Sequence, residues 1–117
     1  GRLFAAMPSP MLVLAPDAPR FTIIDVNAAY LAAMVRERDE LIGAGLFDAF
    51  PDNPGEPEGT GVTNLRASLE RALTSRQPDA MPVQRYDIPR ADGRFEERWW
   101  EPVNTPLLDH KGEVTAL

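Results

Sequence analysis

The alternation of apolar and polar residues predicts a hairpin near the start of the chain. Residues 11–14 (MLVL) form a short apolar run, and residues 21–26 (FTIIDV) are rich in β-branched side chains. Both features are typical of strands. The intervening Pro16-Asp17-Ala18-Pro19 has the composition of a turn, because proline and aspartate favour turn backbone angles. We therefore expect two antiparallel strands joined by this turn.

The periodicity changes at Asn27, where the second strand runs into a helix. Tyr30, Leu31 and Met34 share one face at helical spacing, which predicts a helix over residues 28–34. The Asn27 side chain can accept a hydrogen bond from the backbone N–H of residue 29 or 30, so it would cap this helix. Two roles remain open for Asn27: a helix cap alone, or a cap that also borders a binding pocket.

Two short helical turns follow, at residues 36–43 and 46–50, and the first ends at Gly43. Residues 51–61 (PDNPGEPEGTG) form a loop rich in proline, glycine and acid. The longest helix is predicted over residues 63–76, because apolar side chains recur there at helical spacing. The members of this apolar stripe are Val62, Leu65, Leu69, Ala72 and Leu73.

The remainder of the chain reads as β structure. Residues 81–89, 95–107 and 113–117 have strand character, and Asp92-Gly93 between the first two is a strong hairpin signal. Residues 109–112 (DHKG) form the next turn. The order is therefore two strands, several helices and three strands. Three hairpins imply an antiparallel sheet with the helices over one face, which is the α+β class.

Composition narrows the classes of function. The chain has 117 residues, enough for one domain with a modest core. Its net charge of −6 repels phosphate backbones, so we expect no nucleic-acid partner. Cysteine is absent, which excludes disulfides, thiolate metal sites and cysteine nucleophiles. No apolar run approaches the ~20 residues of a membrane helix, so we expect no membrane contact by this segment and a cytoplasmic location.

The two ends of the sequence suggest a segment excised from a longer protein. Residues 1–10 have the character of a helical lead-in interrupted by prolines, and residues 113–117 read as a strand that is cut short. We therefore expect residues 1–117 to be a single domain, followed by an output domain in the same polypeptide.

Three stretches of the sequence together resemble the PAS family of sensor domains. Residues 23–34 (IIDVNAAYLAAM) are similar to the family's second strand and first helix, and residues 36–50 (RERDELIGAGLFDAF) are similar to its next segment. Residues 91–114 (ADGRFEERWWEPVNTPLLDHKGEV) are similar to its last hairpins. The resemblance spans residues 7–117. The pairing of residues 83–90 (VQRYDIPR) with 95–106 (FEERWWEPVNTP) resembles a subgroup of bacterial sensor histidine kinases and hybrid regulators.

The resemblance implies a five-stranded antiparallel sheet with helices over one face, and in many members a ligand between the two. The residues implied for such a pocket are Asn27, Tyr30, Met34, Phe47, Leu65, Leu69, Arg85, Glu97, Trp99 and Asn104. Because several of these side chains are apolar, their default role is core packing, and the two roles overlap.

The residues also restrict the cofactors that a member of this family would hold. Light-driven covalent flavin chemistry uses an Asn-x-Cys-Arg motif in the family, and thiol-linked chromophores need a cysteine as well, so both are excluded. Haem-binding members use a histidine on the long helix. Residues 63–76 contain none, and His110 lies in a predicted turn, which argues against haem. A non-covalent flavin near Trp99, Trp100 and Asn104, or a small metabolite, remains open.

Residues 95–107 leave one structural question unanswered. Each face of this strand carries a tryptophan, Trp99 on one and Trp100 on the other, so the sequence does not identify the buried face. Arg85 on the preceding strand can pair with Glu97. This pair would either recognise a polar ligand inside a pocket or form part of a surface ladder of cross-strand charges.

The loop carboxylates are a weaker signal. Close carboxylates can bind calcium, but the spacing of an EF-hand is absent, which favours a solvated acidic loop. The residues concerned are Asp48, Asp52, Asn53, Glu56 and Glu58.

Three classes of function remain. The first is a sensory module that binds a small molecule and passes a conformational bias to an output domain. The second is a ligand-free module that forms a homodimer or binds a partner, with Leu3, Phe4 and Met7 as the interface. The third is a small α+β enzyme with Glu97 as base, which the hairpin-first order argues against. We expect no catalytic activity from this chain.

Overall fold

The computed structural model describes residues 2–55 and 60–117, and gives no account of the side chains of Arg2 and Leu3. The chain divides into two compact units, residues 1–49 and residues 50–117. In the described residues, no helix is long and apolar enough to cross a bilayer.

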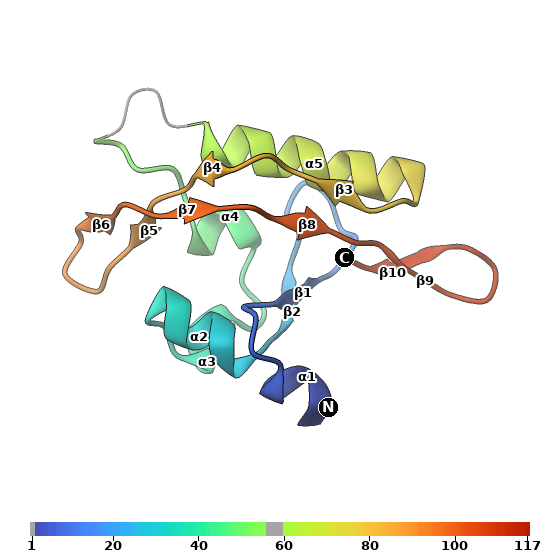
Figure 1. Cartoon of the computed structure of the whole chain (residues 1–117), viewed down its shortest axis with the longest axis horizontal. Helices are drawn as coiled ribbons and strands as arrows, with labels where there is room; N and C mark the ends of the chain where they lie inside the picture. The colour runs from blue at the N-terminus through green and yellow to red at the C-terminus, as the bar shows by residue number, and fades with distance from the viewer. Residues whose placement is uncertain (1, 56–59) are drawn as a thin grey trace. The chain divides into compact units, whose positions relative to one another are not determined.

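The first unit begins with a short helix and an antiparallel hairpin, and continues with three short helices (Figure 1). The hairpin pairs Leu12 with Val26 and Val13 with Asp25. This arrangement confirms the expected strand, turn, strand and capped helix. The elements are α1 Arg2–Ala6, β1 Leu12–Leu14, β2 Ile23–Val26, α2 Ala28–Met34, α3 Arg38–Leu41 and α4 Leu46–Ala49.

One residue of the first unit departs from its expected conformation. Phe21 was predicted to start the second strand, but its φ angle is 48°, in the left-handed region, and β2 begins at Ile23. The Phe21 side chain is fully buried and its ring packs edge-on against Phe47, with 6.4 Å between ring centroids. Burial of an aromatic ring stabilises by about 2–3 kcal/mol, which exceeds the ~1–2 kcal/mol cost of left-handed backbone.

The second unit consists of one long helix and two hairpins (Figure 1). The helix is α5 Gly61–Ser75. The long hairpin pairs β3 with β8, β4 with β7 and β5 with β6, and the last hairpin pairs β9 with β10, all antiparallel. The strands are β3 Asp79–Ala80, β4 Gln84–Arg85, β5 Ile88–Pro89, β6 Phe95–Glu96, β7 Trp99–Trp100, β8 Val103–Asn104, β9 Leu107–Leu108 and β10 Val114–Ala116.

The two long strands expected at 81–89 and 95–107 are divided into short ladders. Pro82, Pro102 and Pro106 lie at two of the breaks, where proline has no N–H to donate to a ladder. The break at residues 86–87 and 97–98 contains no proline, and there the N–H of Tyr86 still donates to the carbonyl of Arg98 at 2.9 Å.

The turn between the two long strands is formed as expected at Asp92-Gly93, where Gly93 has a φ angle of 83°. The five extended segments predicted from the sequence are present and form three antiparallel hairpins. In the described residues their hydrogen-bonded pairs are separate two-stranded ladders, whereas the sequence predicted one five-stranded sheet.

The structure identifies the exposed face of residues 95–107. Trp99 is 60% exposed and Val103 is 61% exposed, whereas Trp100 and Asn104 are half-buried and Pro106 is buried. The Trp100 indole also donates a hydrogen bond of 3.1 Å from Nε1 to the carbonyl of Tyr86. The even-numbered residues thus face inward and the odd-numbered residues face solvent.

This assignment predicts different costs for removing the two tryptophans. Trp100→Ala should lower the free energy of unfolding by about 2–4 kcal/mol, because packing and an indole hydrogen bond are lost together. Trp99→Ala should lower it by less than ~1 kcal/mol, since an exposed side chain gains little on folding. Urea unfolding of the two matched variants measures this, and equal costs would contradict the assignment.

Candidate functional site

The Asn27 junction is the first group of functional candidates, and it lies within the first unit. Asn27 is fully buried and its Oδ1 accepts a hydrogen bond of 2.9 Å from the N–H of Tyr30, which confirms the cap. Tyr30 and Met34 are buried on α2, and Phe47 is half-buried on α4. Burial raises the pKa of the Tyr30 phenol well above its usual value, so this residue is a neutral, largely apolar element of the unit.

A polar seam between α5 and the long hairpin is the second group, and it lies within the second unit. We define this seam by three helix residues at helical spacing, Asn64, Ser68 and Arg71. Asn64 donates from Nδ2 to Oε1 of Gln84 at 2.7 Å. Arg71 donates to both carboxylate oxygens of Asp79 at 3.0 and 3.1 Å. The helix is therefore held to the hairpin by side-chain hydrogen bonds along about two turns.

Ser68 occupies the centre of the seam. Its hydroxyl is fully buried, donates to Oδ2 of Asp79 and accepts a 2.8 Å hydrogen bond from Nδ2 of Asn104. Asp79 and Asn104 are themselves opposite one another in the β3–β8 ladder. Hydrogen bonds from Arg71 and Ser68 keep the pKa of Asp79 below its usual value, so this carboxylate is charged at neutral pH.

The start of α5 packs tightly on the hairpin because Gly61 has no side chain. A Cβ there would lie 2.8 Å from the Tyr86 ring and 3.2 Å from the carbonyl of Arg85. The Tyr86 hydroxyl in turn donates to the carbonyl of Phe50. The Asp52 carboxylate accepts a hydrogen bond of 3.1 Å from the N–H of Val62 and so satisfies a free donor at the helix start.

Asp87 forms a second buried polar group on the hairpin. Its side chain is 3% exposed and accepts two hydrogen bonds from Arg85, at 3.0 and 3.1 Å, and one from Asn53 at 3.1 Å. The hydrogen bonds from the Arg85 guanidinium have the largest effect on the pKa of Asp87 and lower it, and the Asn53 amide lowers it further. Burial acts in the opposite direction. Arg85 also lies 3.3 Å from Glu97, so the expected pair forms, but the Glu97 side chain is 58% exposed.

The structure brings some of the sequence-predicted residues together and separates others. Asn104 joins the polar seam, and Arg85 turns mainly to Asp87. Glu97 and Trp99 lie instead on the exposed face of the hairpin. Successive residues of a strand point to opposite faces, so these odd-numbered residues point away from the inner face that carries Trp100. The Arg85–Glu97 pair therefore has the geometry of the surface charge ladder.

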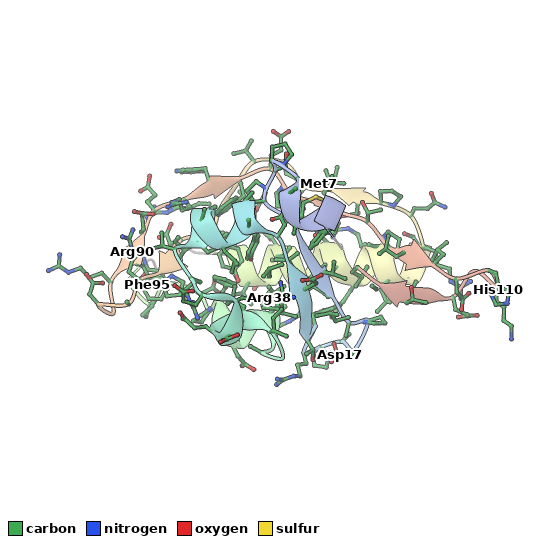
Figure 2. All side chains as sticks on the ribbon, turned by 90° about the horizontal axis from the view of Figure 1, so that it is seen from below. Met7, Asp17, Arg38, Arg90, Phe95 and His110 are labelled. Atoms are coloured by element: carbon green, nitrogen blue, oxygen red, sulfur yellow. The ribbon has the colours of Figure 1, made fainter. Side chains whose placement is uncertain are left out.

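The remaining predicted residues have simpler positions. Leu69 is buried and Leu65 half-buried on α5, as the apolar stripe implies. Phe4 is half-buried, and Met7 is 38% exposed at the end of α1 (Figure 2). The side chain of Leu3 lies outside the described part of the chain.

The described acidic residues are used for capping and ion pairing. Across residues 2–55 and 60–117, no group of three or more His, Cys, Asp or Glu side chains is placed to hold a metal ion. Asp48 pairs with Arg20, Asp52 caps α5 and Asn53 bonds Asp87. Glu56 and Glu58 lie outside the described residues. His110 is exposed at the β9–β10 turn, away from the hairpin tip that carries Arg90 and Phe95 (Figure 2).

Sequence reasoning missed the polar seam and the role of Asp87. The spacing of residues 64, 68 and 71 was visible, but polar residues at helical spacing are usually the solvent face of a helix. The partners of Asp87 include Asn53, which is 34 residues away. No local pattern indicates such a pairing, so only the folded chain reveals it.

Comparison with protein families identifies the fold. The model of the family described as the PAS fold matches residues 4–117. A comparison with curated proteins gives no match.

Solved structures agree with the family match. An RNA-binding Light-Oxygen-Voltage receptor superimposes with a TM-score of 0.70 at 19% identity, over 98% of this chain and 29% of the receptor. The PAS domain of a protein from Colwellia psychrerythraea gives a TM-score of 0.68 at 14% identity, over 98% and 85%. The PAS domain of the fruit-fly ELK potassium channel gives 0.65 at 14% identity, over 98% and 85%. This chain spans less than a third of the receptor, and at these identities the likeness establishes the fold alone.

Ser68 should contribute measurably to stability. Ser68→Ala leaves Asn104 and Asp79 without their shared partner in a buried place, so the free energy of unfolding should fall by about 1–3 kcal/mol. Ser75→Ala is the matched control, because Ser75 lies on the same helix and its hydroxyl accepts only a solvent-exposed hydrogen bond of 3.2 Å from the N–H of Gln77. This change should cost less than ~0.5 kcal/mol. Chemical denaturation of both variants tests this, and a neutral Ser68→Ala would refute the seam as a structural element.

Asp87 should contribute stability that depends on pH. Because its folded pKa is lowered from 3.8, its contribution is complete above that value and is lost as pH falls through the folded pKa. Asp87→Asn should therefore cost about 1–3 kcal/mol at pH 7, and the difference from wild type should shrink below pH ~4. Urea titrations between pH 7 and pH 2.5 measure the difference. A gap that stays constant over this range would contradict the assignment.

Proposed function

This chain belongs to the PAS fold family, and from that premise we propose that it is the sensory module of a bacterial signal-transduction protein, most simply a sensor histidine kinase. As a PAS domain it has a generic role in sensing and signalling. We propose further that a small molecule or a non-covalent cofactor binds to it in the cytoplasm, and that an output domain in the same polypeptide receives the signal. The chain itself catalyses no reaction in this proposal.

The family match over residues 4–117 carries the proposal, and the polar seam supports it. Ser68 and Asn104 are polar groups held between a helix and a hairpin. A net protein hydrogen bond is worth only about 1 kcal/mol, so a ligand that supplies equivalent donors and acceptors can replace one at small cost. Replacing interdigitated apolar side chains would instead open a cavity at several times that cost.

The ligand chemistry that best suits the candidates is a mostly apolar molecule with a few polar groups. Within the second unit, Leu69 and Met81 are buried and apolar, and Asn104 offers an amide. This mixture is typical of small-molecule sites. The absence of cysteine limits a flavin to non-covalent binding.

A second candidate function is protomer association without a ligand. Phe4, on α1, is half-buried, and Met7, directly after α1, is 38% exposed. Apolar side chains that are exposed in this way favour contact with a second copy of the chain. In this alternative the domain aligns two protomers of a larger protein and its interior is filled by its own side chains.

Native mass spectrometry of freshly purified protein, with an absorption spectrum of the same sample, tests the first proposal. We expect a stoichiometric added mass that is lost on denaturation, and absorption bands would identify a flavin or another chromophore. A bare chain, together with no binding in a screen of flavins and small metabolites, would reject ligand sensing.

Two matched variants locate the binding site. Asn104→Ala, on the inner face, should weaken retention of the added mass at least tenfold, whereas Trp99→Ala, on the exposed face, should leave it unchanged. A mass of two chains that becomes one chain in Phe4→Ser, with no added mass in either, would favour the association function instead.

A further inference from the structure

The Asn27 side chain connects the start of α2 to the lead-in segment, which we define as residues 2–11. Oδ1 accepts one hydrogen bond from the N–H of Tyr30 and a second from the N–H of Met11, both at 2.9 Å. Nδ2 donates to the carbonyl of Ser9 at 2.7 Å. One buried amide therefore bonds the first turn of a helix and a segment that lies 16 to 18 residues earlier.

Apart from the packing of α1 against α2, the lead-in segment has few other means of attachment near this point. Residues 7–11 are all exposed, and the prolines at positions 8 and 10 have no N–H. The carbonyl of Met7 also accepts from Nδ2 of Asn27 at 3.4 Å, and the carbonyl of Met11 accepts from the Asn27 N–H at 3.0 Å. The hydrogen bonds from Met7, Ser9 and Met11 to the rest of the unit thus converge on a single residue.

The helix that shares this amide is short. α2 has seven residues, and helices of this length are marginal without a cap and tertiary packing. Opening of its first turn removes the Tyr30 donor and frees the Asn27 backbone from its extended conformation, at φ −93° and ψ 169°. Because the same Oδ1 serves Met11, disorder in one partner weakens the other.

We propose that Asn27 couples the order of α2 to the attachment of the lead-in segment, so that displacement of α2 releases residues 7–11. The coupling is reciprocal, because both segments bias the same side chain. Insofar as it rests on the proposed function, a ligand whose binding displaces α2 would report its presence through the lead-in segment. The coupling itself requires no ligand.

Amide hydrogen exchange of the ligand-free protein, followed by NMR, tests the coupling. Ala32→Gly weakens α2 at an exposed position and leaves the Asn27 side chain and its partners in place. We expect exchange of the Met11 amide to accelerate at least threefold. Glu70→Gly is the control, because it places glycine at an exposed position of α5. In this variant the exchange rate of the Met11 amide should rise only as far as the loss of free energy of unfolding of the whole chain requires.

A second variant distinguishes coupling from general loosening. Asn27→Ser retains a capping oxygen but lacks the amide that reaches Ser9. Met11 should already exchange fast in this variant, and adding Ala32→Gly should have no further effect. The proposal would be overturned if Ala32→Gly left Met11 exchange unchanged. It would also be overturned if Ala32→Gly accelerated Met11 exchange equally in the wild-type and the Asn27→Ser backgrounds. If Asn27→Ser does not fold, the comparison of Ala32→Gly with Glu70→Gly decides alone. Neither outcome depends on whether a ligand exists.

Discussion

A buried polar side chain has to find its hydrogen-bond partners inside the chain, and this constraint organises both units. Asn27 and Ser68 are fully buried, and each forms hydrogen bonds with another segment of the chain. Asn27 accepts from the N–H of Met11, and Ser68 donates to the carboxylate of Asp79. An unmet bond at such a site costs about 1–3 kcal/mol, a large part of the ~5–15 kcal/mol that stabilises a typical domain. Apolar side chains tolerate small shifts, whereas these bonds form in one register only. The apolar core therefore supplies most of the driving force, and the polar groups determine where each element lies.

The prolines of the second unit impose a different constraint on the same hairpin. Pro102 and Pro106 interrupt a strand that the sequence pattern suggests is continuous, and between them only the short β8 is paired, with β3. A ladder that lacks the N–H donors of its prolines holds two strands together less firmly than an unbroken one. Side-chain bonds from α5 supply part of what the backbone does not, which explains why polar residues occupy a helix face that would ordinarily be apolar.

The local features of the fold could be predicted because local chemistry determines them. The Asn27 cap needs only an amide three residues before a free N–H, and the Asp92-Gly93 turn needs only a residue that tolerates positive φ. The site was harder to predict. Phe21 leaves the strand because of a ring contact with Phe47, which no local pattern encodes. The buried face of residues 95–107 could not be predicted, since each face has a tryptophan. The contacts of Ser68 could not be predicted either, because the helical spacing of Asn64, Ser68 and Arg71 is also that of a solvent-facing helix surface.

These two hydrogen-bonded junctions have a common consequence for a sensory domain. Such a domain must let one element move relative to another without unfolding, and the cost of the movement decides whether a ligand can drive it. Sliding an apolar interface opens a cavity at ~24 cal/mol per Å³, while exchanging one satisfied hydrogen bond for another costs little because both states are bonded. Asn27 and Ser68 are each placed where a helix meets an extended segment. Displacement of α2 or α5 therefore depends on whether a competing donor or acceptor takes over the hydrogen bonds that Asn27 and Ser68 make.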